Sequence, residues 1–448
     1  LLTRGPRTAQ SRQQTLRATM DWSFGLLDES EQHLLCRLSV FAGGCTLEGI
    51  AAVAGLESNA PAVQLTLERL TAKSLARRLA TGDEPRYGLL ETIRQYGALR
   101  LGETGDGDQV RRRHTLWYLE QQEVADSAWY SPAQPAALAW TDREQENLRA
   151  ALARTVEEGD REMGARFLAG LWRYWETRGY LAEGRRWQER ILSGPLPSEA
   201  GVVWARAMAG AGRLAEMAGD YPRAATWYET SLAVWRQLDE RQGIADTLLG
   251  LGVVRASEGN LDLAEQFFHE SLDLNRALAY RPGIIVALNN LGGVAFYRGD
   301  TARAATLWQE SLDLSRRHGD PRSAARALNN LGEVARGLGQ HHTVAIRFRE
   351  GLTVNRDMGD MGGIALSLEG ISAALSALGR RERAAKLRGA VEAARESAGL
   401  SITPHDREIY DRDGAEIRST LGSARYDACL AEGRGMGLTA AIELALTE

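Results

Sequence analysis

The stretch LNNLGGVAFYRGDTARAATLWQESLDLSRRHGD, residues 288–320, decides the fold because its pattern recurs on both sides at a spacing of 40 residues. Two series of glycines keep this spacing without an insertion: Gly212, Gly252, Gly292 and Gly332, and Gly219, Gly259, Gly299, Gly339 and Gly379. Two further columns share the register: Leu232, Leu272, Leu312 and Leu352, and Arg236, Arg276, Arg316 and Arg356. Self-similarity of this length predicts an array of helical repeats, about six of them between roughly residues 161 and 400.

Each repeat is predicted to hold two helices. Pro282 suits the first turn of the first helix, because the N–H that proline lacks would have no partner there. Gly299 is predicted to end this helix and Asp300 to cap the second one. The buried faces are predicted at Leu288, Leu291 and Ala295 on the first helix and at Ala304, Trp308 and Leu312 on the second.

The composition excludes several classes of protein. The chain has 54 basic and 59 acidic side chains, a formal net charge of −5, which gives no overall footprint for nucleic acid or an anionic membrane. It contains no run of about 18 apolar residues and no signal peptide, so we expect a cytoplasmic protein. Cys36, Cys45 and Cys429 lack metal-ligand spacing and are expected in the core. Because the chain starts at Leu1 without methionine, we expect it to be part of a longer protein.

The first hundred residues follow other patterns. Helical spacing from Thr15 is followed by a second predicted helix that Asp28 could cap, and by helices near 46–53 and 62–73. Residues 75–80 and 86–90 then predict two short strands around a turn. A helix over 91–101 completes the order that is typical of a winged-helix domain.

These patterns divide the chain into five segments. The composition of GETGDGDQ, residues 102–109, predicts a linker, and the aromatic-rich stretch after it predicts a substantial helical core. The period is lost after about residue 400, where short helices are expected to cover the last apolar face of the array. We therefore predict a connector at 1–14, a winged-helix domain at 15–108, a helical region at 109–200, repeats at 201–400 and a helical cap at 401–448.

The repeats resemble tetratricopeptide repeats (TPR). Leu291-Gly292 in the first helix, followed by Ala304 and Trp308 in the second, is similar to the TPR consensus. The period of 40 exceeds the usual length of about 34 residues and resembles the lengthened repeats of regulatory arrays. The predicted fold is thus mainly α, a winged helix followed by a right-handed α-solenoid of TPR-like helix pairs.

The first half resembles bacterial signal-transduction ATPases of the STAND class, a group that includes large LuxR-type and antibiotic-regulatory (SARP-like) transcription activators. Four ordered motifs carry the resemblance: RQQTLRATMDWSFGLLDESEQHLLCRLSVFAGG at 12–44, YGLLETIRQYGALRL at 87–101, RRRHTLWYLE at 111–120 and EQENLRAAL at 144–152. In that family the winged helix packs on an ATPase domain, and the helical array senses an inducer or a partner. The resemblance implies the same roles here.

Two departures from the family concern the nucleotide. Leu90 and Glu91 stand where related members carry the His and Asp of a motif that touches bound ADP. A phosphate-binding loop needs a glycine before its lysine, whereas Lys73 and Lys386 both follow alanine. We therefore expect no cofactor in this chain and assign ATP or ADP to an upstream domain. No catalytic or metal-binding constellation is predicted, because the histidines form no HExxH pair and no serine stands in a nucleophile elbow.

The candidate binding residues lie on the first helices of the array, which are expected to line a concave groove. Asn290 and Asn330 directly precede Leu-Gly, the position at which lengthened TPR arrays often hold a peptide backbone, and an amide can both donate and accept. The alternative is that asparagines here bridge neighbouring helices. The groove candidates for a protein, peptide or small-molecule inducer are Asn289, Asn290, Tyr297, Arg326, Asn329, Asn330, Glu333 and Arg336.

The second functional hypothesis is DNA binding, specific or sequence-independent, through the winged helix. Its candidate recognition helix offers Arg69 and Lys73 against Glu68. The hairpin is similarly balanced, with Arg77, Arg78 and Arg86 against Asp83 and Glu84. Phosphate neutralisation supplies most nonspecific affinity, so this balance favours packing within the protein over DNA contact.

Overall fold

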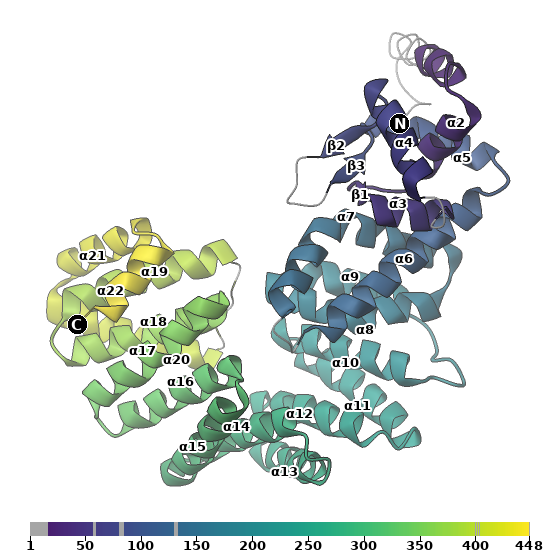
Figure 1. Ribbon diagram of the computed structural model, residues 1–448. Coiled ribbons are helices and arrows are strands. Elements are labelled where there is room, and N and C mark those ends of the chain that lie inside the picture. Colours follow the sequence, from purple (N-terminus) through teal and green to yellow (C-terminus); the bar gives the residue numbers. More distant parts are fainter. Residues whose placement is uncertain are drawn as a thin grey trace. The chain divides into compact units, whose positions relative to one another are not determined.

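The computed structural model describes residues 17–56, 60–79, 85–129, 133–398, 400, 402 and 404–447. It confirms the predicted fold class: a small winged helix is followed by helices packed in pairs (Figure 1). The chain divides into two compact units, which are described separately below. Unit 1 comprises residues 1–175 and 182–198, and unit 2 comprises residues 176–181 and 199–448.

The winged helix opens unit 1. Residues 17–25 are helical, and Asp28 begins the next helix with a capping box, in which its carboxylate accepts from the N–H of Glu31. The predicted hairpin of β2 and β3 is present. The sheet also has a third strand, β1, which was not predicted because only two of its residues pair with β3. The elements are α2 Glu29–Leu38, β1 Cys45–Thr46, α3 Leu47–Ala54, α4 Ala60–Ala72, β2 Arg77–Leu79, β3 Arg86–Gly88 and α5 Glu91–Glu103.

The predicted linker at 102–109 is wrong, because helix α6, Gly107–Ser127, begins inside it. Its glycine content reflects a tight corner between α5 and α6: a Cβ at Gly107 would lie 2.4 Å from the carbonyl oxygen of Leu101. Asp106 fixes this corner by an ion pair of 2.8 Å with Arg37. The predicted connector at 1–14 lies outside the described residues.

A buried polar cluster joins the sheet of the winged helix to the helices that follow. Arg86 on β3 and Glu144 on α7, Gln134–Glu158, form an ion pair in which both side chains are buried. Tyr118 on α6 and Asn147 on α7 donate further hydrogen bonds to Glu144 Oε2, at 3.1 and 2.8 Å. The winged helix therefore packs on α6 and α7 rather than extending from a linker.

Six helix pairs follow between residues 161 and 398 of the described chain. They are α8 Arg161–Arg178 with α9 Leu181–Ile191, α10 Val202–Met217 with α11 Tyr221–Gln237, α12 Arg241–Ser257 with α13 Leu261–Ala277, α14 Arg281–Tyr297 with α15 Thr301–His318, α16 Pro321–Gly337 with α17 His341–Met358, and α18 Met361–Ala377 with α19 Arg381–Ala398.

The two glycine columns have different physical causes. In the first column, a Cβ at Gly292 would lie 2.5 Å from Nε1 of Trp308, and the other members face Tyr228, Phe268 and Phe348 at similar distances, so these glycines make room for an aromatic ring from the second helix. In the second column, the glycine between the two helices of a pair has a positive φ, 82° at Gly299, which favours glycine. Both columns are thus requirements of helix-pair packing.

The first helices of unit 2 lie on the inner side of its curve. Consecutive first helices touch one another from α10 to α18, whereas the second helices of the described chain mainly touch first helices. In Figure 1, α12 and α14 correspondingly lie inside α13 and α15. The arginine column faces solvent on the second helices, where Arg236 and Arg316 form ion pairs with Glu270 and Glu350 of the next repeat.

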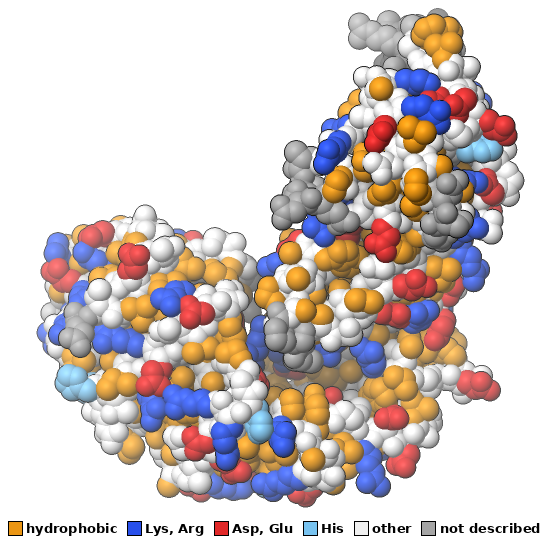
Figure 2. Space-filling view, in the orientation of Figure 1, with side chains coloured by type: hydrophobic (Ala, Val, Ile, Leu, Met, Phe, Trp, Pro, Cys, Tyr) orange, Lys and Arg blue, Asp and Glu red, His pale blue; other side chains and the backbone are white. Residues whose placement is uncertain are grey.

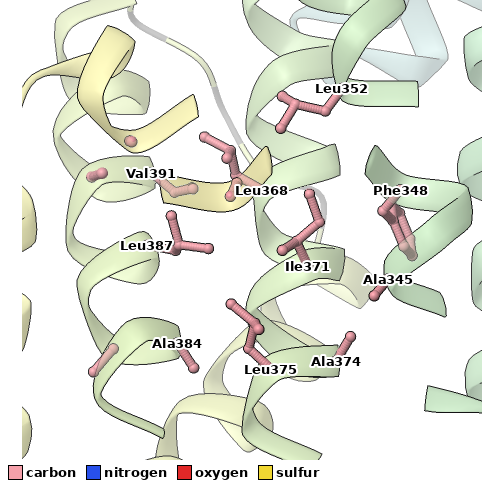
Figure 3. Packing of buried hydrophobic residues seen from close by; sticks show 14 of the residues in the cluster. Ala345, Phe348, Leu352, Leu368, Ile371, Ala374, Leu375, Ala384, Leu387 and Val391 are labelled. Atoms are coloured by element: carbon pink, nitrogen blue, oxygen red, sulfur yellow. The ribbon is translucent and has the colours of Figure 1, made fainter. Parts of the chain in front are cut away.

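The C-terminal helices cover the end of the array. Helix α22, Leu438–Leu446, packs on α17, α18 and α19, and α21, Ser423–Gly435, packs closely on α19. Figure 3 shows the core beneath them, with Phe348, Leu368 and Ile371 between the helices. Close contact of α19 with α21 depends on small residues, because a Cβ at Gly389 would lie 2.0 Å from the carbonyl oxygen of Leu430. Helix α20, Pro404–Leu421, contacts α18, α19 and α21.

Candidate partner-binding groove

One exposed column runs along the inner side of the array. Its members recur every 40 residues in the middle of each first helix, and most are exposed although the helices around them are packed. Their chemistry changes at every step, unlike that of the packing columns. They are Arg206, Asp246, Val286, Arg326 and Leu366.

Arg326 is a candidate residue that is exposed and makes no polar contact with the described protein. Its side chain is exposed, and it has no hydrogen-bond or ion-pair partner among the residues that the structure describes. Burial around the guanidinium lowers the pKa of Arg326, and the charges of Arg213 and Arg322 lower it further. Glu176 and Asp360 oppose this effect. The groove therefore presents a crowded positive charge at this point.

The paired asparagines have different surroundings. Asn289 is buried, and its side-chain oxygen accepts a hydrogen bond of 3.0 Å from the amide of Asn330 in the next repeat. Asn329 is also buried, and its oxygen accepts a hydrogen bond of 3.2 Å from Ser367 on α18. These two hydrogen bonds link neighbouring helices, as the alternative prediction for the asparagines states. Asn290 is half-buried, and a role for it in binding a partner stays a prediction.

The remaining candidates differ in how far other side chains already contact them. Tyr297, at the end of α14, is 57% exposed and packs edge-on against Phe296. Glu333 and Arg336 form an ion pair, and Arg336 forms a second one, of 3.0 Å, with Asp413 on α20. Arg336 is therefore already bound by the C-terminal helices, whereas the side chains of Tyr297 and Arg326 are exposed.

The candidate recognition helix of the winged helix has its positive charges neutralised. Lys73, at the end of α4, forms an ion pair of 2.6 Å with the buried Glu31, and Arg69 lies within ion-pair distance of Asp28 and Glu31. Figure 2 shows basic and acidic side chains interspersed over the visible face of unit 1. Two arginines of β2, Arg77 and Arg78, remain exposed.

The positions that correspond to the family's nucleotide motif are engaged locally. Leu90 is the N-cap of α5 and is 48% exposed. Hydrogen bonds from Arg94 and Gln95 lower the pKa of Glu91 to about 2.

In the described part of the chain, no group of three or more His, Cys, Asp or Glu side chains could hold a metal ion. Every described helix is too short or too polar to cross a lipid bilayer.

Sequence reasoning named Arg326 but missed the rest of its column. The 40-residue period itself would have identified Arg206 and Asp246, since stepping back from Arg326 leads directly to them. It also missed Arg213, whose guanidinium forms ion pairs with Glu176 and Glu216, at 2.8 and 2.6 Å. Glu176 lies one period before Glu216, but the 40-residue spacing alone does not show that both carboxylates meet the same arginine.

Comparison with known proteins agrees with both parts of the fold. The family model of a winged helix-turn-helix domain matches residues 27–102, and that of the tetratricopeptide repeat matches residues 205–277 and 283–357. Both kinds of domain are regulatory or interaction modules without catalytic chemistry of their own. A crystal structure of a STAND protein with a tetratricopeptide repeat sensor, from Pyrococcus horikoshii, has the same fold. It has a TM-score of 0.55 and 14% identity, over 92% of this chain and 54% of that chain.

Curated relatives come from Mycobacterium tuberculosis (strain ATCC 25618 / H37Rv). One is named as an HTH-type transcriptional regulator and is 38% identical over 195 residues, 43% of this chain and 22% of that protein. Another, an uncharacterized protein, is 39% identical over 116 residues, 25% of this chain and 29% of that protein. The chain thus matches less than a third of the length of either relative. The chain combines a winged helix-turn-helix domain with tetratricopeptide repeats.

Proposed function

We propose that this chain is the sensor and interaction module of a STAND-type, ATP-dependent transcriptional regulator. In this proposal a protein, a peptide or a small inducer binds in the groove of the array and controls an ATPase domain upstream. One observation carries the proposal: the packing columns repeat their residue types, whereas the groove column changes from Arg206 to Asp246, Val286, Arg326 and Leu366. Helix packing does not account for this variation, whereas a column of chemically different exposed side chains is what recognition of one particular ligand would use.

The position of Tyr297 and Arg326 supports this reading. They lie in consecutive repeats, and both are exposed. Tyrosine and arginine supply much of the energy of protein interfaces, because each combines a large apolar surface with a polar end. An exposed guanidinium without a partner, surrounded by groove walls, favours a ligand that brings an acceptor or a negative charge.

Site-specific photo-crosslinking in the full-length protein, in its own cells, tests the proposal. A benzophenone amino acid would replace Tyr297 on the groove or Ile346 on a second helix, two positions of nearly equal exposure, 57% and 55%. We expect a discrete crosslinked species, identified by mass spectrometry, from position 297 only. The same species should weaken when Arg326→Ala is added. Equal crosslinking from both positions, or none from 297, would contradict the groove assignment.

DNA binding is the second candidate, because Arg77 and Arg78 are exposed on β2 and have no ion-pair partner among the described residues. It predicts binding to random duplex that weakens steeply as salt rises and that is lost in the double variant Arg77→Ala/Arg78→Ala. Absence of any mobility shift at low salt would remove this candidate.

A further inference from the structure

A cavity lies between four helices at the C-terminal end of unit 2. It is lined by α18, α19, α20 and α21 and has a volume of about 760 Å³. Pockets that bind small molecules commonly measure about 300–1,000 Å³, so the cavity is large enough for a ligand of that class. It is separate from the column of Arg326. Its lining includes Glu369, Arg388, Tyr410, Gly414, Tyr426 and Leu430.

Arg388 on α19 is the unusual residue of this cavity. It is only 5% exposed, and its Nε has no hydrogen-bond partner. Across the described residues, no carboxylate lies within ion-pair distance of its guanidinium. A buried charge without a counter-ion is costly, and proteins normally pair it.

The carboxylates around the cavity are committed elsewhere. Asp413 is held 3.0 Å from Arg336, and burial raises its pKa. Asp411 is exposed. The other acidic residues of the lining each have an arginine partner: Glu369 with Arg395, Glu392 and Glu396 with Arg434, and Asp427 with Arg418. The paired carboxylates are therefore not available to Arg388, and the exposed Asp411 does not lie within ion-pair distance of its guanidinium.

The walls around Arg388 leave room on one side of its guanidinium. The ring of Tyr410 stacks on one face of the Arg388 guanidinium, with the ring centroid 3.6 Å from Cζ of Arg388. The Tyr410 hydroxyl donates a hydrogen bond of 3.2 Å to Glu392. One turn further along the same face of α20, a Cβ at Gly414 would lie 2.5 Å from Nη2 of Arg388, so a larger residue would displace the guanidinium. A planar guanidinium stacked in this way can present an edge to two oxygens at once.

We propose that this cavity binds a small organic anion, with a carboxylate or a phosphate group on the guanidinium of Arg388 and an apolar body against Tyr426 and Leu430. The bound anion is the counter-ion that Arg388 lacks within the protein. The site is independent of the groove, so it can exist whether or not the groove binds a partner.

Isothermal titration calorimetry of the 448-residue protein with benzoate and with phenyl phosphate tests the proposal. The two probes show whether the site prefers a carboxylate or a phosphate group. We expect saturable binding of at least one probe at millimolar concentrations or below. Arg388→Met should weaken it at least about tenfold, the effect of a charge-assisted hydrogen-bonded pair. Arg388→Lys, which keeps the charge but loses the planar fork, should weaken it less.

The control is Arg425→Gln, because Arg425 on α21 is paired with Glu382 at 2.7 Å and does not line the cavity. Its affinity for the probes should stay within about twofold of the unaltered protein, as for an exposed pair. The proposal is overturned if neither probe binds, or if Arg388→Met and Arg388→Lys bind as tightly as the unaltered protein. Circular dichroism of each variant verifies that it is folded.

Discussion

The side-chain amide of Asn330 donates a hydrogen bond of 3.0 Å to the side-chain oxygen of Asn289, one repeat earlier in the array. The same Asn289 accepts at its backbone carbonyl from Trp308 Nε1, at 2.8 Å. The first helix of one repeat is thus tied both to its own second helix and to the next first helix. This relationship gives two asparagines of the motif a part in stability.

We expect Asn289→Ala and Asn330→Ala each to lower the free energy of unfolding by about 1 kcal/mol, since each removes one partly buried hydrogen bond. The double variant should lose less than the sum of the two, because both changes remove the same bond. Urea unfolding followed by circular dichroism measures these differences. Asn290→Ala is the control and should change stability by less than about 0.5 kcal/mol. Additive losses would contradict the coupling.

Two adjacent glycines of α14 give a second prediction. A Cβ at Gly292 would lie 2.5 Å from the indole of Trp308, whereas one at Gly293 would meet no atom within 4 Å. We therefore expect Gly292→Ala to destabilise the array by about 1–3 kcal/mol through overpacking. Gly293→Ala should be neutral or stabilise by up to about 1 kcal/mol, because alanine favours the helix. Thermal unfolding of both variants checks the difference in sign, and equal effects would refute the packing role of Gly292.

The contrast between these glycines shows what sequence could predict. A period of 40 residues makes the packing columns visible, since the glycine of Gly292 and the aromatic ring of Trp308 recur in the four repeats between residues 202 and 358. The glycine at the end of each first helix is predictable for a local reason, its positive φ. Fold class and helix boundaries in the array follow from such local and periodic causes.

The site was less predictable, because it depends on the rotation of each helix. Asn329 and Asn330 are adjacent and chemically identical, yet the first is buried against Ser367 and the second is only half-buried. Similarly, β1 is too short to have a strand pattern, and it exists because Cys45 pairs with Tyr87. Arg388 lies in the last repeat, but its surroundings come from α20, where the period no longer guides prediction.

The buried ion pair between Arg86 and Glu144 gives a third prediction. We expect Glu144→Gln to lower the stability of unit 1 by about 3–5 kcal/mol, because it leaves the guanidinium of Arg86 buried and unpaired. Replacing both residues, as Arg86→Met with Glu144→Leu, should recover much of the loss. Near-UV circular dichroism during urea unfolding follows the tyrosines and tryptophans around this cluster.

An exposed pair in the same unit is the control for this experiment. Arg166 and Glu123 form an ion pair of 2.9 Å, but their side chains are 36% and 43% exposed. Glu123→Gln should cost less than about 1 kcal/mol, because water screens the pair. If Glu144→Gln cost no more than Glu123→Gln, the buried pair would not fix the winged helix on α7.

His114 on α6 gives the last prediction, a dependence of stability on pH. Burial lowers its pKa from 6.5 to about 4, and its ring packs against Phe41 and Tyr118. The folded state therefore binds this proton less tightly than the unfolded chain does. The stability linked to His114 is fully present above pH 6.5 and falls as the pH drops toward 4, by about 3 kcal/mol in all. Urea unfolding at several pH values should show this decline, and His114→Phe should remove it between pH 6.5 and 4; an unchanged slope in the variant would assign the decline to other groups.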